Sequence, residues 1–283
     1  MKSIQDLIKL SNEVEIPCMG YGTWRTPAGD DTVTAVKSAI ECGFRHIDTA
    51  QLYGNEESVG EGIRAAGIDR REIFLTTKLK NSDQGYDATL KAFESSLKRL
   101  GVEYVDLYLI HWPVPVMFKD NWQEISRQTW KAMERLYEEK LIRAIGLSNF
   151  LPHHIENITA SANVAPVVDQ LEIHPCFTQR QTVKYCQDHK IQVQAWSPLG
   201  HGTILQNETL AAIAASHKKT PAQTALRWEL QQNIIPISKS MNISRMKENA
   251  DVYDFELSAE EMEQIFALGE DGRTGPDPDN IDF

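Results

Sequence analysis

The feature that most constrains this chain is an alternation of short β-branched runs with longer helical stretches, which repeats eight times. Residues 105–112, VDLYLIHW, form an almost unbroken apolar run, which is typical of a parallel strand buried on both faces. Val33, Val36 and Ile40 share one stripe of a stretch that this spacing predicts to be a helix. Eight such units of about 30 residues each predict one α/β domain over residues 1–283, folded as a (β/α)8 TIM barrel.

Both ends of the chain add to this plan. Residues 8–16, IKLSNEVEI, predict a β-hairpin that caps the bottom of the barrel. Residues 259–268 predict an extra C-terminal helix, and the acidic residues and loop formers of 269–283 predict a tail. An open doubly wound sheet is the alternative, but no GxGxxG follows the first expected strand, so the barrel is favoured. The runs expected as strands are residues 19–24, 45–50, 73–79, 105–112, 142–149, 166–173, 192–199 and 233–238.

The charge balance limits what this chain binds. Its 29 basic and 40 acidic residues give a net charge of −11, which argues against binding nucleic acid or an anionic membrane. No run approaches the roughly 20 apolar residues that a membrane span needs, and the first residues lack the apolar region of a secretion signal. We therefore expect a cytoplasmic protein, and a monomer. The cysteines show no CxxC spacing, so neither a metal site nor a redox pair is expected; they are Cys18, Cys42, Cys176 and Cys186.

Four ionisable side chains follow the C-terminal ends of three consecutive expected strands. Asp48 lies at the end of the second strand, and Tyr53 follows five residues later. Lys78 and His111 lie at the ends of the third and fourth strands. Each residue alone has an ordinary structural explanation, but the C-terminal ends of barrel strands meet at one mouth, where active sites lie. The sequence therefore predicts a shared catalytic site.

These residue types suit the reduction of a carbonyl group. A tyrosine has a pKa of about 10, which an adjacent Lys78 ammonium is expected to lower. Asp48 is expected to hold Lys78 protonated and aimed. His111 can donate a hydrogen bond to the carbonyl oxygen, and Tyr53 can protonate it. No side chain donates a hydride, so a cofactor is expected to supply it.

Longer motifs give the chain a family resemblance. Residues 43–60, GFRHIDTAQLYGNEESVG, resemble the first signature of the aldo-keto reductases and carry its aspartate and tyrosine. Lys78 in LTTKL and His111 in LIHWP match the rest of the family's catalytic tetrad. IGLSNF at residues 145–150 resembles its central motif, and KSMNISRMKEN at residues 239–249 resembles its cofactor-phosphate motif. The resemblance covers essentially the whole chain and implies reversible NAD(P)H-dependent reduction of aldehydes and ketones on a (β/α)8 barrel, without a metal.

The resemblance also implies which residues hold the cofactor. Trp196 matches the position whose ring stacks on the nicotinamide, where many members have tyrosine. The other matches belong to the carboxamide (Ser148, Asn149, Gln170), the pyrophosphate (Ser197, Leu199), the first-strand contact (Gly22, Thr23), the adenosine 2′-phosphate (Lys239, Ser240, Arg245) and the adenine (Glu248, Asn249).

A basic cluster supports the phosphate site independently of the resemblance. Residues 237–247 contain Lys239, Arg245 and Lys247 and no acidic residue, in a chain of net charge −11. They follow the eighth expected strand and enter a helix N-terminus, where barrels often bind phosphate. A solvated basic helix start is the alternative. We therefore predict NADPH/NADP+ as the cofactor, in preference to NADH.

Substrate recognition is less constrained by the sequence. Trp24, Trp112 and His111 are expected to line the pocket, although packing would also explain aromatic residues at strand ends. The tail resembles those of bacterial members related to 2,5-diketo-gluconate reductases. Small carbonyls, α-dicarbonyls and keto sugar acids are therefore the expected small-molecule substrates. Two positions depart from the family pattern, because Ser238 stands where many members have proline and Glu13 where glycine is common in the hairpin turn.

Two other functions stay open at this point. A regulatory nicotinamide-binding subunit, similar to the potassium-channel β subunits, keeps the same tetrad with little turnover. A barrel aldolase would use Lys78 as a Schiff base, but this leaves the basic cluster unexplained.

Overall fold

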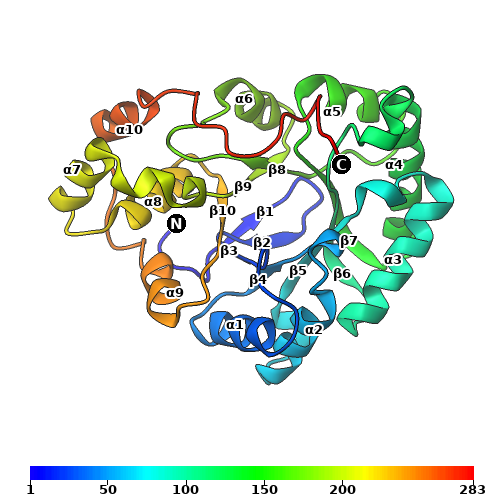
Figure 1. Cartoon of the computed structure of the whole chain (residues 1–283), viewed down its shortest axis with the longest axis horizontal. Helices are drawn as coiled ribbons and strands as arrows, with labels where there is room; N and C mark the ends of the chain where they lie inside the picture. The colour runs from blue at the N-terminus through cyan, green and yellow to red at the C-terminus, as the bar shows by residue number, and fades with distance from the viewer.

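Eight parallel strands close into a barrel in the order β10-β3-β4-β5-β6-β7-β8-β9, as the alternation predicts. The computed structural model describes all 283 residues, and Figure 1 shows the strands enclosed by helices. The barrel strands are β3 (Gly20–Gly22), β4 (His46–Asp48), β5 (Phe74–Leu79), β6 (Val105–Ile110), β7 (Ile142–Ser148), β8 (Val168–Glu172), β9 (Gln192–Trp196) and β10 (Ile235–Ser238).

The helices begin and end where local sequence signals place them. The chain of α8 turns into helix at Pro221, and the side chain of Thr220 before it accepts a hydrogen bond from the Gln223 amide. The long α3 ends at Gly101, whose φ of 66° suits glycine. The helices are α1 (Asp30–Glu41), α2 (Glu56–Ala65), α3 (Tyr86–Leu100), α4 (Trp122–Glu138), α5 (Pro152–Thr159), α6 (Arg180–Asp188), α7 (Glu208–Ser216), α8 (Pro221–Gln231), α9 (Ile243–Ala250) and α10 (Ala259–Phe266).

An N-terminal hairpin closes one end of the barrel, which confirms the expected cap. Strands β1 (Leu7–Lys9) and β2 (Glu15–Pro17) pair antiparallel and lie across the barrel in Figure 1. Leu10 and Ile16 are buried in one apolar cluster with residues of the barrel interior. The hairpin therefore covers apolar side chains that would otherwise face water.

Side chains inside the barrel change from apolar to polar along the strands. Phe74, Leu107, Val168 and Ile235 belong to the apolar cluster at the hairpin end of the interior. Towards the C-terminal ends of the strands, the buried interior positions carry Asp48, Lys78, Ser148, Gln170 and Gln194. A second and larger apolar cluster of 48 residues fills the space between the strands and the helices. The barrel interior is therefore a packed apolar core at the hairpin end and carries the polar side chains of the candidate site at the other end.

Six of the expected strands, those observed as β3, β4, β6, β7, β8 and β9, end earlier than the sequence predicts. In β7 and β9 a turn of the backbone gives the reason. Residues 149 and 197 were expected to be part of strands, but Asn149 has a φ of 67° and Ser197 a φ of 49°. Both residues adopt the left-handed conformation, which no strand contains, and this turns the chain outward at the mouth of the barrel. The expectation of longer strands is wrong there because apolar patterning does not report such turns.

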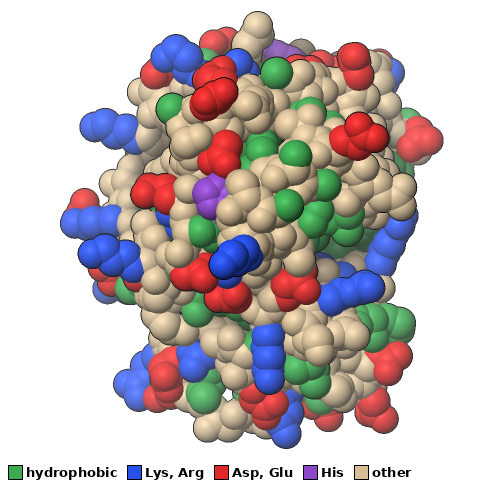
Figure 2. All heavy atoms as spheres, turned by 90° about the vertical axis from the view of Figure 1, so that its left-hand side faces the viewer, with side chains coloured by type: hydrophobic (Ala, Val, Ile, Leu, Met, Phe, Trp, Pro, Cys, Tyr) green, Lys and Arg blue, Asp and Glu red, His purple; other side chains and the backbone are tan.

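The tail after α10 runs past α6 and α5 over the C-terminal ends of the strands, as the red segment of Figure 1 shows. On the side of the molecule that carries α7 to α10, acidic and basic side chains are interspersed (Figure 2). None of the helices combines the length and the apolar character needed to traverse a bilayer.

Candidate active site

The structure brings the four ionisable strand-end residues together at the mouth of the barrel. The Lys78 ammonium is fully buried and donates to Asp48 Oδ1 at 2.6 Å. It also lies 3.4 Å from the Tyr53 hydroxyl, within reach of a weak hydrogen bond. Tyr53 follows β4 on a short 3-10 turn, and its ring packs edge-on against that of His111 at 5.7 Å between centroids.

The charges of Lys78 and Tyr53 follow from burial and from each other. Burial lowers the pKa of Lys78, but the Asp48 carboxylate and Tyr53 more than offset this, so its pKa lies above the usual value. Burial raises the pKa of Tyr53, and the Lys78 ammonium only partly counteracts it. The expectation of a lowered tyrosine pKa is therefore wrong for the chain alone. Tyr53 keeps its proton and Lys78 its charge at neutral pH.

His111 is held as a neutral imidazole. Burial and the Lys78 charge lower its pKa well below the usual value. Its Nδ1 atom is buried and has no hydrogen-bond partner. A neutral imidazole can donate one hydrogen bond to a substrate oxygen without bringing a positive charge next to Lys78.

A second set of side chains lies beside these four, at the ends of β7 and β9. The Asn149 amide donates to the backbone oxygen of His111 at 3.0 Å and to Ser148 Oγ at 3.1 Å. The indole of Trp196 donates to Asn149 Oδ1 at 2.8 Å. Asn149 thus links the His111 loop to the indole of Trp196 and orients the N–H edge of that ring.

Gln170 on β8 contacts the catalytic group directly, which the sequence did not predict. Its Nε2 donates to Asp48 Oδ2 at 2.8 Å, while its backbone oxygen accepts from Ser148 Oγ at 2.9 Å. Asp48 therefore accepts a hydrogen bond from Lys78 on one oxygen and from Gln170 on the other, which fixes both side-chain torsions of Asp48.

The residues expected near the pyrophosphate have mixed environments. Thr23 is fully buried, and its hydroxyl donates to the backbone oxygen of Asp48 at 3.0 Å, so its side chain is engaged within the chain. Leu199 is partly buried and packs against the main apolar cluster. Ser197 is half-buried, and its hydroxyl lies 3.2 Å from His201 Nε2. Gly22 pairs with Asp48 in the sheet, so its backbone adjoins the catalytic group.

The expected phosphate-binding residues lie after β10 and in the first turn of α9. Burial lowers the pKa of Lys239, and the positive charge of Arg25 lowers it further. Lys239 and Arg25 are therefore two cations close to one another. The backbone amide of exposed Arg245 donates to the side chain of Asn242 at the start of α9. The backbone oxygen of Ser240 accepts from the Tyr21 hydroxyl at 2.7 Å. Adjacent cations at a helix start favour a bound anion, so these residues fit a phosphate.

The two residues expected near the adenine lie further along α9. Asn249 is buried, and Glu248 accepts a hydrogen bond from the Thr220 hydroxyl at 2.8 Å. Glu248 therefore also ties α9 to the start of α8.

The two tryptophans expected in the pocket occupy different parts of the mouth. Trp112 is only 6% exposed and packs edge-on against Trp196 and Phe283, at centroid distances of 6.5 and 5.7 Å. Trp24 is 40% exposed, with the Arg25 guanidinium 4.1 Å from its ring centroid. Trp112 is thus a buried wall and Trp24 an accessible rim.

The tail is held to the mouth by a buried carboxylate, Glu172 at the end of β8. Its Oε1 accepts from the Thr274 amide at 2.6 Å and from the Thr274 hydroxyl, and its Oε2 accepts from the Gly275 amide at 2.9 Å. Burial raises the pKa of Glu172. The hydrogen bonds from His174 and from the tail lower it by a larger amount, so its pKa lies below the usual value. An ionised carboxylate therefore clasps the tail beside Trp196.

With this geometry in place, comparison with known proteins decides the family. The model of the Aldo/keto reductase family matches residues 18–270. The chain belongs to the aldo-keto reductase family. The branch related to 2,5-diketo-gluconate reductases stays a prediction.

Several relatives match this aldo-keto reductase along its whole length. It is 51% identical over 277 residues to the 9,11-endoperoxide prostaglandin H2 reductase of Trypanosoma cruzi, covering 97% of this chain and 95% of that protein. It is 48% identical over 281 residues to the glyoxal reductase of Bacillus subtilis, covering 99% of both. A crystal structure of a Gox0644 mutant in complex with NADPH superposes with a TM-score of 0.92 at 43% identity, covering 99% of both chains.

A second contact of this aldo-keto reductase's tail joins Asp279 to α5. Asp279 Oδ1 lies 2.9 Å from the Nε2 atoms of both His153 and His154. This trio has the composition of a metal site. However, His154 Nδ1 accepts a hydrogen bond from the Leu151 amide, so the proton of its neutral ring is on Nε2, which then has no lone pair for a metal. The trio therefore attaches the tail to α5, with the hydrogen bond made between His153 and Asp279.

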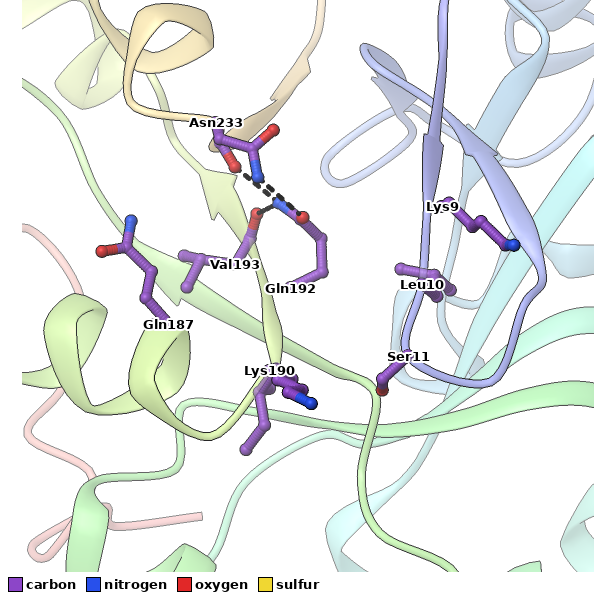
Figure 3. Close-up of a pocket in the computed structure, with 9 residues that line it drawn as sticks. Lys9, Leu10, Ser11, Gln187, Lys190, Gln192, Val193 and Asn233 are labelled. Atoms are coloured by element: carbon purple, nitrogen blue, oxygen red, sulfur yellow. Dashed lines mark hydrogen bonds between the residues drawn. The ribbon is translucent and has the colours of Figure 1, made fainter.

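A surface cavity of about 420 Å³ lies at the opposite end of the barrel from the tetrad. It is lined by residues of the hairpin, the α6–β9 connection and the chain before β10 (Figure 3). Gln192 donates to the backbone oxygen of Asn233 at 2.6 Å beside this cavity. Lys9 and Lys190 reach its edge, but no residue expected in the active site lines it.

Three residues of this site were not predicted from the sequence. Arg25 directly follows the first expected strand, and a cation at that position was the available signal. Glu172 and Gln194 occupy interior positions of β8 and β9. In VDQLE and QVQAW, polar residues at every second position of a buried strand were the available signal.

Proposed function

We propose that this chain reduces aldehydes and ketones to alcohols with NADPH. The observation that carries this proposal is the convergence of the Tyr53 hydroxyl, the Lys78 ammonium and a neutral His111 at the barrel mouth. The names of its relatives, which include a glyoxal reductase, and the NADPH complex of a similar structure support it.

We propose the following roles for the tetrad. Tyr53 gives its hydroxyl proton to the carbonyl oxygen as that oxygen gains negative charge. Lys78 stabilises the resulting phenolate, and Asp48 holds the ammonium in place at 2.6 Å. His111 donates a hydrogen bond that orients the carbonyl. When bound, the nicotinamide supplies the hydride for the carbonyl carbon.

The cofactor site we propose extends from the tetrad to α9. The amide-bearing and hydroxyl side chains fit a carboxamide, the Trp196 ring offers a stacking face, and the cations after β10 fit the 2′-phosphate. We assign to this site Gly22, Thr23, Ser148, Asn149, Gln170, Trp196, Ser197, Leu199, Lys239, Ser240, Arg245, Glu248 and Asn249.

For the substrate, we propose small carbonyls, α-dicarbonyls or keto sugar acids, which contact Trp24, Trp112 and His111. The buried wall of Trp112 and the accessible rim of Trp24 support an apolar pocket around one polar centre. We further propose that residues 1–283 act as one domain, as a monomer in the cytoplasm, without nucleic acid or membrane partners.

Turnover with a reactive dicarbonyl tests this function. We expect the wild type to oxidise NADPH in the presence of methylglyoxal. Tyr53→Phe should lose about 10²–10⁴-fold in rate while binding NADPH with unchanged affinity, because only the proton donor is removed. An absence of turnover with a panel of carbonyls would favour the regulatory subunit instead, and wild-type turnover by Tyr53→Phe would overturn the proton-donor role. Borohydride trapping at Lys78 without nicotinamide would support the aldolase.

A further inference from the structure

Gln194 is an amide enclosed entirely within the barrel. It lies on β9 and pairs in register with Gln170 on β8, so the two side chains project side by side into the interior. Gln194 is 0% exposed, and its Oε1 accepts a hydrogen bond from Gln170 Nε2 at 2.8 Å.

This hydrogen bond is the first of a series of contacts that ends at Tyr53, the proposed proton donor. The Gln170 amide donates one hydrogen to Gln194 Oε1 and one to Asp48 Oδ2, each at 2.8 Å. Asp48 Oδ1 accepts from Lys78, whose ammonium lies 3.4 Å from the Tyr53 hydroxyl. This series of contacts therefore crosses the barrel from β9 to Tyr53.

The geometry of a primary amide gives Gln194 its influence. The two hydrogens of Gln170 Nε2 lie in one plane at a fixed angle, so two acceptors are needed to fix the rotation of the amide. Asp48 is one acceptor and Gln194 is the other. With Gln194 removed, Gln170 is held at a single point, and its second hydrogen is left without a partner in a buried place.

Packing alone does not account for an amide at this position. The Nε2 atom of Gln194 is buried without a hydrogen-bond partner, which is unfavourable for folding. An apolar side chain of similar size would avoid that unpaired donor. The oxygen of Gln194 is therefore the part of the side chain that the structure uses.

We propose that Gln194 is a positioning residue for carbonyl reduction, because its oxygen fixes the Gln170 amide that holds Asp48 on Lys78. The inference rests on the proposed reductase function. Gln194 acts through other residues, because its side-chain hydrogen bond is to Gln170 and not to Tyr53.

The test replaces the amide by side chains of similar length. Gln194→Met removes the acceptor oxygen, and Gln194→Glu retains one. Gln192→Met is the matched control, because Gln192 lies on the same strand two residues earlier and makes three side-chain hydrogen bonds, none of them to Gln170, Asp48, Lys78 or Tyr53. Steady-state kinetics with NADPH and methylglyoxal would be measured for all three variants and the wild type, together with thermal unfolding.

We expect kcat to fall about fivefold in Gln194→Met, as for the loss of one buried hydrogen bond, with KM for methylglyoxal unchanged. Gln194→Glu should recover most of kcat, and Gln192→Met should match the wild type. Equal kcat values for Gln194→Met and Gln192→Met would overturn the proposal. So would an equal loss in Gln194→Met and Gln194→Glu, or a Gln194→Met chain that fails to fold when Gln192→Met folds.

A second measurement needs no turnover and separates this inference from the proposed function. NMR would follow hydrogen exchange of the Gln170 side-chain amide in the same variants. We expect slow exchange in the wild type, Gln194→Glu and Gln192→Met, and faster exchange in Gln194→Met. Unchanged exchange in Gln194→Met overturns the positioning role, whereas a wild type without turnover but with the expected exchange pattern overturns only the reductase function.

Discussion

Gly275 in the tail lies directly against the indole of Trp196. A methyl group at Gly275 would overlap the Cη2 atom of Trp196 and come within 3.1 Å of Glu172 Oε2. The clasp of Glu172 on the Gly275 amide keeps this contact closed. The tail thus determines how far the indole can move, although the two residues are far apart in the sequence.

This contact predicts that Gly275→Ala weakens cofactor binding. The added methyl group must displace either the indole, which is the proposed nicotinamide stacking face, or the tail. We expect the Kd for NADPH to rise about three- to tenfold, measured by quenching of tryptophan fluorescence. Pro276→Ala, at the exposed neighbouring position, is the control and should bind NADPH normally. Unchanged affinity in Gly275→Ala would show that the tail moves aside without cost.

Arg245 is predicted to distinguish the two nicotinamide cofactors. Arg245 lies exposed in the first turn of α9, shortly after Lys239 in the sequence, and its guanidinium is free to donate hydrogen bonds to a 2′-phosphate. We expect Arg245→Gln to raise the Kd for NADPH about tenfold or more and to leave that for NADH within about twofold. Lys247→Gln is the control, because Lys247 lies on the same helix but near Cys42, and it should bind both cofactors normally. Equal losses for both cofactors would contradict a role in phosphate recognition.

Two buried histidines predict a loss of stability in acid. Burial lowers the pKa of His46 and of His154 to about 4, so both rings are neutral in the folded chain. On unfolding they regain a pKa of about 6.5 and take up protons, so stability falls as the pH drops from about 6.5 to about 4. We expect a loss of about 1.4 kcal/mol per pH unit for each histidine, measured by urea unfolding at several pH values.

The variant His46→Asn assigns one part of this pH dependence. It should lessen the slope of stability against pH by the share of one histidine, whereas His189→Gln, at an exposed site, should leave the slope unchanged. A stability that stays flat across this pH range would contradict the assignment.

Glu13 predicts a gain of stability on substitution. Its φ of 71° places an ordinary side chain in the left-handed region within the hairpin turn. Its ion pair with Lys9 is highly exposed and contributes little. We expect Glu13→Gly to stabilise the fold by about 0.5–1 kcal/mol, seen as a higher midpoint of thermal unfolding. Glu13→Ala retains the strain and should show no gain; an equal gain in both variants would exclude backbone strain as the cause.

The barrel and the place of its chemistry follow from the amino-acid sequence. The repeated alternation predicts the closed sheet, because apolar runs such as residues 105–112 require cover on both faces. The same alternation places Asp48, Lys78 and His111 at neighbouring strand ends, since parallel strands all point to one mouth. The basic residues after the eighth strand are likewise evident without any knowledge of packing.

How these residues act on one another depends on the packing of the closed barrel. Gln170 meets Asp48 across the barrel, 122 residues apart, because closure and strand register bring β8 opposite β4. The pKa of Tyr53 depends on burial as well as on Lys78, and the extent of burial is a property of the packed site. The positions of the tail and of Gln194 also depend on the closure of the barrel and the register of its strands. Local patterning specifies which residues face inward, whereas the closed barrel specifies which of them touch.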